Sequence, residues 1–197
     1  MNLLTVIFIG RSGCGKGTQI EKLVSFLKAN DQGEIFCLET GARFRSFIKS
    51  DGYVNDLARA VGDSGGLQPE FLAILMWADE IVKNMKPDQH LILDGVARRI
   101  NEAKVLDSAL DFLKRGRVHL VYLNVSKEWA VDKLEKRGRH DDKASEDINR
   151  RMKWFEESVT PVLEHYKSKE NVVFHDINGE QSIEDVHEDI MKSLDLK

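Results

Sequence analysis

Residues 10–18, with the sequence GRSGCGKGT, constrain the fold of this chain more than any other segment. They follow the apolar run 3–9 and precede a segment with helical periodicity. A glycine-rich turn between a buried strand and a helix presents backbone N–H groups and the positive end of the helix dipole to an anion. The pattern is typical of a phosphate-binding loop in which Lys16 reaches the outer phosphates of a nucleotide. Such loops usually have Ser or Thr directly after the lysine, whereas here Gly17 intervenes before Thr18.

Short apolar runs alternate with longer segments of helical period along the rest of the chain. Apolar runs without polar alternation are typical of strands that a parallel sheet buries on both faces. We expect strands at 4–9, 35–38, 90–93, 118–123 and 172–175, and helices at 16–29, 69–85, 101–113, 127–137, 144–167 and 182–194. The pattern predicts an α/β fold of three layers, with a five-stranded parallel sheet and helices on both of its faces.

Two stretches interrupt this alternation. Residues 39–68 contain two short helical pieces separated by the turn 50–52, which predicts a small helical flap inserted into the sheet domain. The polar turn 137–143 is too short to fold independently, but it can cover a site as a lid. We therefore expect a core made of residues 1–38, 69–136 and 144–197, with the flap at 39–68 and the lid loop at 137–143.

Composition excludes several classes of protein. The chain has 197 residues and a formal net charge of −4, so it has no general attraction to nucleic acid or to an anionic membrane, and neither is expected as a partner. Cys14 and Cys37 match neither a disulfide framework nor a zinc site, which predicts two reduced thiols and no zinc. The run 3–9 is far shorter than the roughly 20 apolar residues of a membrane helix. Without a signal-peptide pattern, a cytoplasmic location is expected.

The three tryptophans, Trp77, Trp129 and Trp154, lie in helical segments. Each has apolar neighbours at helical spacing. Packing in or near the core is therefore expected for them, rather than stacking on a base.

Arginines gather at the ends of expected strands and around the two interruptions. Arg45 lies in the flap and Arg98 follows the strand end at 93–95, while Arg137, Arg139 and Arg151 flank the lid loop or follow it by one helix. A single arginine is usually a solvated surface charge. Beside a phosphate-binding loop, this placement favours convergence on one crevice, because guanidinium groups suit the oxygens of a transferring phosphoryl group.

Asp94 is the candidate ligand for a magnesium ion. It ends an apolar strand, where an acidic residue can order Mg²⁺, often through water, and the hydroxyl of Thr18 is a second candidate. The alternative is that Asp94 only caps a turn or a helix.

Five separated motifs, taken in chain order, resemble the adenylate kinase family. They are GCGKGTQ at 13–19, Thr40-Gly41 with Arg45, LDG at 93–95 with Arg98, RGRHDD at 137–142, and Arg151. The resemblance covers nearly the whole chain. The polar turn is similar to that of family members with a very short lid that lacks zinc. The resemblance implies a nucleoside monophosphate kinase that transfers a phosphoryl group reversibly from ATP to AMP with Mg²⁺. Because a closed nucleotide crevice needs no subunit interface, we expect a monomer.

The resemblance also implies roles for single residues. It assigns catalysis to Lys16, Arg98, Arg137, Arg139 and Arg151. It assigns ATP binding to Gly13, Cys14, Gly15, Lys16, Gly17, Thr18, Lys133, Arg137 and Gln181. It assigns AMP binding to Thr40, Gly41, Arg45, Gly66, Leu67, Gln68, Gly95, Arg98, Glu102, Arg139 and Arg151. A monophosphate is already an anionic nucleophile, so the protein need only align the substrates, neutralise charge and exclude water by closing the flap and the lid.

Two departures from the family pattern concern the acceptor. Val96-Ala97 stands before Arg98 where the family usually has Phe-Pro, which leaves Arg98 less firmly held. Glu102 stands at the position of the glutamine that pairs with the adenine of AMP. Glutamine offers one donor and one acceptor, whereas an ionised glutamate offers only acceptors, which suit the N–H groups of guanine.

AMP is nevertheless the expected acceptor, with GMP or another monophosphate as the alternative. Glu102 could accept from the adenine amino group alone, it could be protonated, or Asn101 could supply the donor and acceptor pair. Glu102 could also be a solvated residue of the first helical turn. A further alternative is a protein that binds ATP and transfers nothing, which the absence of Lys16 or of the acceptor-side arginines would favour.

Overall fold

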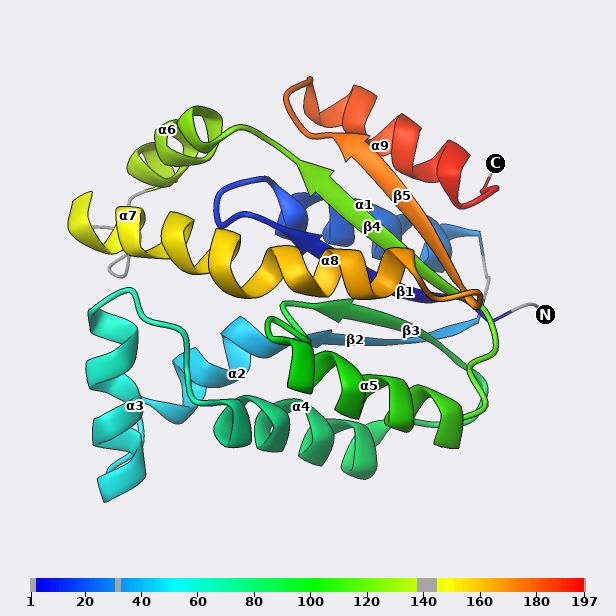
Figure 1. Ribbon diagram of the computed structural model, residues 1–197. Helices are drawn as coiled ribbons and strands as arrows, with labels where there is room; N and C mark the ends of the chain where they lie inside the picture. Colours follow the sequence, from blue (N-terminus) through cyan, green and yellow to red (C-terminus); the bar gives the residue numbers. More distant parts are fainter. Residues whose placement is uncertain (1–2, 31–32, 138–144, 197) are drawn as a thin grey trace.

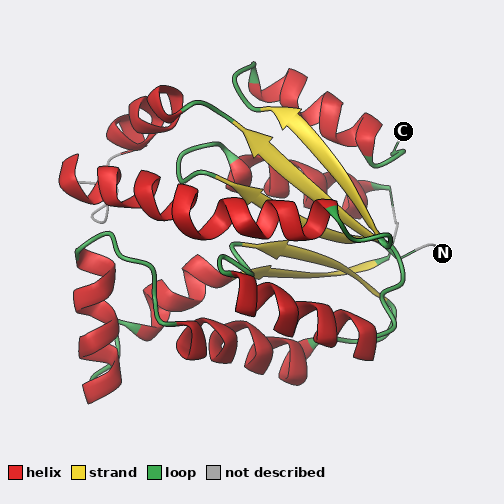
Figure 2. Cartoon of the chain, in the orientation of Figure 1, coloured by secondary structure: helices red, strands yellow, loops and turns green. Residues whose placement is uncertain are grey.

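The computed structural model describes residues 3–30, 33–137 and 145–196. A five-stranded sheet lies between two layers of helices (Figures 1 and 2). Its strands are β1 (Thr5–Gly10), β2 (Glu34–Glu39), β3 (Gln89–Asp94), β4 (Val118–Asn124) and β5 (Val172–Asn178). All neighbouring strands pair in parallel, in the order β2-β3-β1-β4-β5. The predicted α/β fold with a five-stranded parallel sheet is confirmed.

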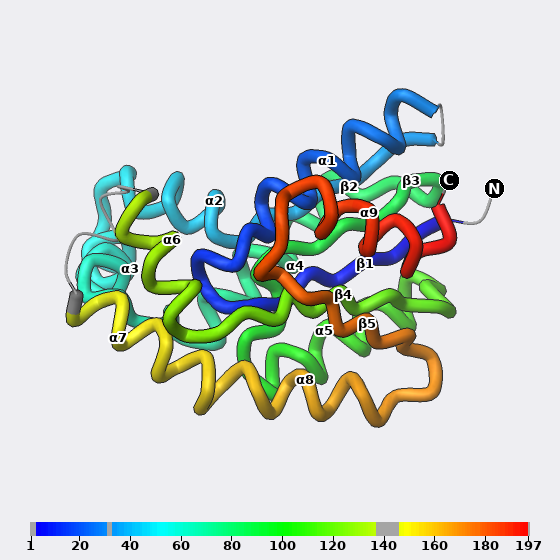
Figure 3. The backbone as a smooth tube through the Cα atoms, turned by 90° about the horizontal axis from the view of Figure 1, so that it is seen from above, coloured from blue at the N-terminus to red at the C-terminus, as the bar shows by residue number. Residues whose placement is uncertain are grey.

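Each face of the sheet supports its own hydrophobic cluster, because successive strand residues point to opposite faces. In β1, Ile7 and Ile9 belong to one cluster, while Val6 and Phe8 belong to the other. The first cluster includes residues of α4 (Glu70–Asn84), α5 (Ile100–Phe112) and α8 (Thr160–Lys167), and the second includes residues of α1 (Lys16–Ala29), α6 (Lys127–Arg137) and α9 (Ile183–Ser193). Figure 3 shows α1 and α9 on one side of the sheet and α8 on the other.

The helix expected at 144–167 contains a π-helical turn. It consists of α7 (Ser145–Trp154), the π turn η2 (Phe155–Val159) and α8. Pro161 lies in the first turn of α8. Because proline has no N–H group and its ring clashes with the carbonyl four residues earlier, it disfavours regular helix at this place. The π turn is the local solution, and the expectation of an uninterrupted helix was wrong here.

The flap has the two helices that were expected, α2 (Thr40–Phe47) and α3 (Tyr53–Asp63). Arg59 of α3 joins them by donating from Nε and Nη2 to the carbonyl of Ile48, at 3.0 and 2.7 Å. The flap lies beyond the carboxyl ends of β2 and β3 (Figure 1). Residues 138–144, which include almost all of the expected lid loop, lie outside the described residues.

The order of the strands creates a crevice at the carboxyl end of β1. Its neighbours in the sheet are β3 and β4, so the chain crosses to opposite sides of β1 in the two halves of the fold. Ligands of open α/β sheets bind where the strand order reverses in this way. The loop that follows β1 is the predicted phosphate-binding loop. No helix among the described residues is long and apolar enough to cross a membrane.

Candidate active site

The loop after β1 has the backbone that a phosphate site requires. Gly13 and Gly15 have φ angles of +90° and +92°, in the left-handed region that favours glycine. Within the described residues, no side chain caps the N-terminus of α1. Its first N–H groups are therefore available to an anion. The Nζ of Lys16 donates to the carbonyl of Gly10 at 2.8 Å, so it lies across the loop.

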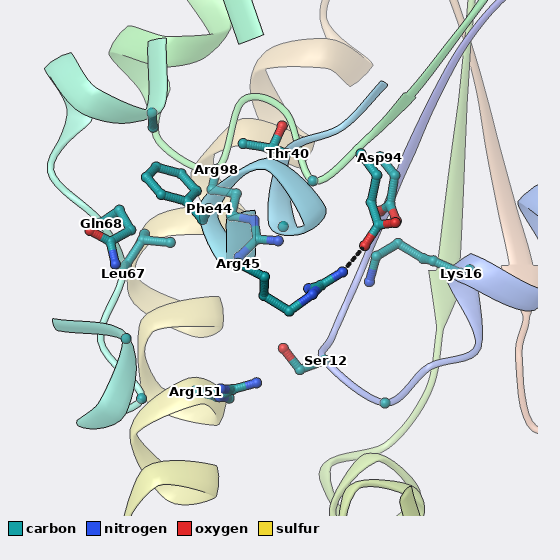
Figure 4. A pocket seen from close by; sticks show the side chains of 18 of the residues that line it. Ser12, Lys16, Thr40, Phe44, Arg45, Leu67, Gln68, Asp94, Arg98 and Arg151 are labelled. Atoms are coloured by element: carbon teal, nitrogen blue, oxygen red, sulfur yellow. Dashed lines mark hydrogen bonds and ion pairs between the residues drawn. The ribbon is translucent and has the colours of Figure 1, made fainter. Parts of the chain in front are cut away.

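One cleft, with a volume of about 730 Å³, runs from this loop to the flap (Figure 4). This size is within the range of small-molecule sites. Its lining includes the following residues with expected roles: Gly13, Gly15, Lys16, Gly17, Thr18 and Lys133 for ATP, Asp94 for the metal, and Thr40, Gly41, Arg45, Gly66, Leu67, Gln68, Gly95, Arg98, Glu102 and Arg151 for AMP. The fold therefore brings together residues that are far apart in the sequence.

For four of the expected site residues, the described part of the structure shows no side-chain contact with the cleft. The amide of Gln181 donates to the carbonyl of Asn178 at 3.0 Å and to Asp189 at 2.9 Å, and Gln181 is absent from the described lining. Cys14 is buried with its Sγ 3.5 Å from the Nζ of Lys16, so the expected contact of Cys14 with ATP falls to its backbone. Arg139 and the side chain of Arg137 lie outside the described residues.

Both cysteines are free thiols in the described part of the chain. Cys14 is buried and Cys37 is exposed. Although Cys37 is exposed by its accessible area, surrounding protein atoms partly desolvate the thiol and raise its pKa to about 11, and the neighbouring carboxylates of Asp94 and Glu39 act in the same direction. Cys37 is therefore a neutral thiol at physiological pH.

Three arginines reach the cleft from different elements: Arg45 from α2, Arg98 from the loop before α5, and Arg151 from α7 (Figure 4). Arg45 pairs with Glu39 at 2.6 Å. Burial lowers the pKa of Arg98, and the carboxylates of Asp94 and Glu102 oppose this shift. Arginine nevertheless stays charged in proteins, so the cleft holds a partly desolvated cation that an anionic ligand can pair with.

Asp94 is the last residue of β3 and lines the cleft. Burial raises its pKa, while Lys16 and Arg98 oppose the shift. Among the described residues there is no cluster of three His, Cys, Asp or Glu side chains that could hold a metal ion. Mg²⁺ is commonly held by only one or two carboxylates together with water and substrate phosphates. Asp94 with the hydroxyl of Thr18 therefore fits a magnesium ion that a nucleotide completes.

Two buried polar atoms in the cleft have no hydrogen-bond partner within the part of the chain that the structure describes. They are the hydroxyl of Thr40 and the Oε1 of Gln68, in residues that are 4% and 9% exposed. The other end of the Gln68 amide is fixed, because Nε2 donates to the carbonyl of Ala58 at 2.8 Å. Buried polar atoms are normally paired. At the flap end of the cleft these two atoms indicate a polar ligand.

Glu102 is buried, which excludes the solvated alternative. Its side chain is 2% exposed, its Oε2 accepts from the backbone N–H of Arg98 at 2.8 Å, and its Oε1 accepts from Arg99 at 3.2 Å. Burial raises the pKa of Glu102, and these two hydrogen bonds oppose the shift. Arg99 also donates to the carbonyls of Gln68 at 2.6 Å and Leu67 at 3.2 Å. Glu102 thus braces the turn that carries Arg98 while it lines the cleft.

The turn before Arg98 differs from what proline would allow. Ala97 is buried and has a φ of +58°. Proline fixes φ near −65°, so it is incompatible with this conformation. The replacement of Phe-Pro by Val96-Ala97 therefore accompanies a different turn, in which the protein holds Arg98 by other contacts.

Sequence reasoning missed residues that only the fold places at the cleft. Trp77 is 1% exposed, and Trp129 and Trp154 pack partly buried against the two hydrophobic clusters, which confirms the packing expected for the three tryptophans. Trp154 also lines the cleft beside Arg98. Phe44 and Glu39 also line it. The signal for Trp154 was its position one turn after Arg151 on a helix that faces the crevice.

Comparison with known proteins gives a consistent result. The family model described as "Adenylate kinase" matches residues 8–171. The adenylate kinase of Flavobacterium psychrophilum is 31% identical over 188 residues, which cover 93% of this chain and 94% of that protein. The adenylate kinase of Flavobacterium johnsoniae is 30% identical, with 98% and 99% covered, and adenylate kinase 1 of Nostoc sp. is 30% identical, with 96% and 97% covered. The chain therefore belongs to the adenylate kinase family.

Proposed function

We propose that this protein catalyses the reversible, magnesium-dependent reaction ATP + AMP = 2 ADP. The observation that carries the proposal is the continuous cleft that joins the phosphate loop to the flap, with Arg45, Arg98 and Arg151 around it. A cleft for one nucleotide would not need the second half, where Thr40 and Gln68 each keep a polar atom with no hydrogen-bond partner among the described residues.

ATP binds at the phosphate loop. The N-terminus of α1 and the loop N–H groups bind the phosphates, and the Nζ of Lys16 exchanges its contact with the Gly10 carbonyl for phosphate oxygens. Asp94, with Thr18, would hold the magnesium ion, which supplies positive charge to the phosphate oxygens.

AMP binds at the flap end. Arg45 and Arg98 pair with its phosphate, and Thr40 adds a hydroxyl group. The backbone of Gly41 and Gly95 and the segment 66–68 line the same part of the cleft, with Glu102 beside the base. The phosphate of AMP attacks as an anion, so alignment and charge neutralisation suffice without a general base.

Arg151 stabilises the transferring phosphoryl group from α7, in addition to Lys16 of the phosphate loop and Arg98 of the acceptor turn. We assign the same stabilising role to Arg137 and Arg139 of the lid loop at 137–143. In this proposal the lid loop and the flap 39–68 both close over the core when the nucleotides bind. Lys133 lies at the ATP end of the cleft. The contacts of Gln181 give no support for its expected place beside the ATP base.

AMP is preferred to GMP as the acceptor. Each oxygen of Glu102 already accepts one hydrogen bond, from Arg98 N–H and from Arg99, so part of the acceptor capacity of the carboxylate is used before a base binds. The names of the similar proteins support the same choice. Because one chain supplies both halves of the cleft, we propose that a monomer is active. The cytoplasmic location stays a prediction.

A bisubstrate analogue tests the two-nucleotide site. Calorimetry should show that two adenosines joined by a polyphosphate bind about 100-fold more tightly than ATP, because one ligand occupies both halves. Arg98→Met should remove most of this advantage while leaving ATP affinity unchanged. Equal affinities for ATP and the analogue in the native protein would instead favour a protein that binds ATP and transfers nothing.

A further inference from the structure

Trp154 contacts both the flap and the arginine that we assign to the acceptor phosphate. Its indole Nε1 donates a hydrogen bond to the carbonyl of Gly65 at 3.2 Å. The guanidinium carbon of Arg98 lies 5.5 Å from the centroid of its ring. The residue is half-buried and lines the cleft. One side chain of α7 therefore joins two segments that are remote from it in the sequence.

The ring supplies a support that the acceptor turn lacks. Val96 and Ala97 offer no aromatic side chain beside Arg98, and Ala97 has a left-handed backbone. A cation over an aromatic face is attracted by the ring, and more strongly where water is excluded. Glu102 fixes the backbone N–H of Arg98, whereas Trp154 contacts the guanidinium itself. The two contacts restrain different parts of the same residue.

The hydrogen bond holds the flap where backbone already approaches backbone. Gly65 has a φ of +65°, and a Cβ atom at this position would lie 2.7 Å from the carbonyl oxygen of Asp147 on α7. The flap thus touches α7 at Asp147 and at Trp154, two turns apart on the helix. Only the contact at Trp154 also reaches Arg98.

A π turn lies directly beside this residue in the chain. It begins directly after Trp154, and π turns inside helices are frequent at functional sites. The next residue, Phe155, is buried in the core with the guanidinium of Arg11 4.7 Å from its ring centroid. Adjacent aromatic residues of one helix therefore contact an arginine of the acceptor turn and an arginine of the phosphate loop.

We propose that Trp154 is a positioning residue that couples the docking of the flap segment 62–66 to the orientation of Arg98. The inference rests on the proposed role of Arg98 as a ligand of the AMP phosphate. The hydrogen bond to Gly65 favours the docked flap and so acts on AMP binding. The ring holds the guanidinium in place and so acts on the transfer step.

Two substitutions separate these contacts. Trp154→Phe keeps an aromatic ring beside Arg98 and loses the donor to Gly65. It should raise KM for AMP about three- to tenfold, the effect of one hydrogen bond, with kcat and KM for ATP within about twofold of the native values. Trp154→Leu also loses the ring and should lower kcat about tenfold. In an Arg98→Met background, Trp154→Leu should lower kcat no further.

Hydrogen exchange in the protein without nucleotide gives a second readout that does not need turnover. Amides of 61–68 should exchange faster in Trp154→Phe than in the native protein. Phe174→Leu is the matched control, because a cation also lies over the ring of Phe174 on β5: the Nζ of Lys167 is 5.0 Å from the ring centroid. Phe174 is not among the described residues that line the cleft. The control should leave exchange at 61–68 and KM for AMP unchanged.

The outcomes distinguish this inference from the proposed function. Unchanged exchange and unchanged KM for AMP in Trp154→Phe would overturn the inference while the enzyme remained an adenylate kinase. A further loss of kcat on adding Trp154→Leu to Arg98→Met would overturn the coupling through Arg98. If the native protein formed no ADP while exchange at 61–68 still responded to Trp154→Phe, the proposed function would fail and the flap contact would stand.

Discussion

Alanine substitutions at three glycines of the phosphate loop should destabilise the protein in a fixed order. At Gly17 no described atom beyond the adjacent residues and the backbone of its own helix lies within 4 Å of an added Cβ, and φ is not in the positive range. At Gly15 the space is equally open among the described atoms, but φ is +92°. At Gly13 φ is +90°, and the Cβ would lie 2.6 Å from the carbonyl oxygen of Ala130. The three positions thus separate backbone strain from overlap.

The magnitudes follow from these environments. Gly17→Ala should be neutral or stabilise by up to about 1 kcal/mol, because alanine favours helix and Gly17 is in the first turn of α1. Gly15→Ala should cost about 1–2 kcal/mol for a left-handed alanine. Gly13→Ala adds about 1–3 kcal/mol for an overlap with backbone that cannot move freely. Its total cost is therefore about 2–5 kcal/mol.

Urea unfolding of the protein without nucleotide measures this series. The urea concentration at the midpoint should be highest for Gly17→Ala, lower for Gly15→Ala and lowest for Gly13→Ala. The dependence of the unfolding free energy on urea concentration should be the same as in the native protein. Equal midpoints for Gly13→Ala and Gly15→Ala would refute the close packing of the loop against α6. A loss of stability in Gly17→Ala as large as in Gly15→Ala would refute the assignment of strain to the positive φ angle.

Three further substitutions or conditions test other parts of the site and fold. Glu102→Gln should raise the ratio of kcat/KM for AMP to kcat/KM for GMP about tenfold, because the amide gains a donor for adenine and loses acceptor capacity for guanine. Steady-state assays with both acceptors measure this ratio, and a constant or lower ratio would contradict the prediction. Glu39→Gln should lower KM for AMP by up to about fivefold, because the half-exposed pair with Arg45 no longer competes with phosphate, and a raised KM would speak against that competition. The Nδ1 of His119 lies 3.0 Å from the Nε2 of His175, and burial lowers the pKa of both rings. Because the unfolded chain then binds more protons than the folded protein, the melting temperature should fall as the pH drops below about 6.5. His175→Gln should reduce this dependence on pH, and an unchanged dependence would exclude the histidine pair as its cause.

The sequence could predict the architecture because buried parallel strands leave a strong pattern. Every expected strand exists, and the helices at 16–29 and 127–137 have the expected bounds. The largest error in a strand is in β5, expected at 172–175 but extending to Asn178. This strand lies at the edge of the sheet and is only partly buried, so its second half contains polar residues that do not read as a buried strand.

The site was predictable where a motif determines local backbone and less so where tertiary contacts decide. The glycine angles of the loop and the place of Asp94 at a strand end follow from local sequence. The role of Glu102 does not, because it depends on Arg99, which donates to Glu102 and to the carbonyls of Leu67 and Gln68, residues remote from it in the sequence. Trp154 packs against the core as expected, but helical spacing alone does not show that a neighbouring loop brings Arg98 to its ring.

ADP formation from ATP and Mg²⁺ with each of AMP, GMP, CMP, UMP and dTMP tests the central claim most directly, with Lys16→Ala as the control. The account predicts that AMP gives the highest kcat/KM by a wide margin and that Lys16→Ala abolishes the activity. Preference for GMP would contradict the choice of acceptor while keeping the transfer mechanism. Absence of ADP with every monophosphate would contradict the account as a whole.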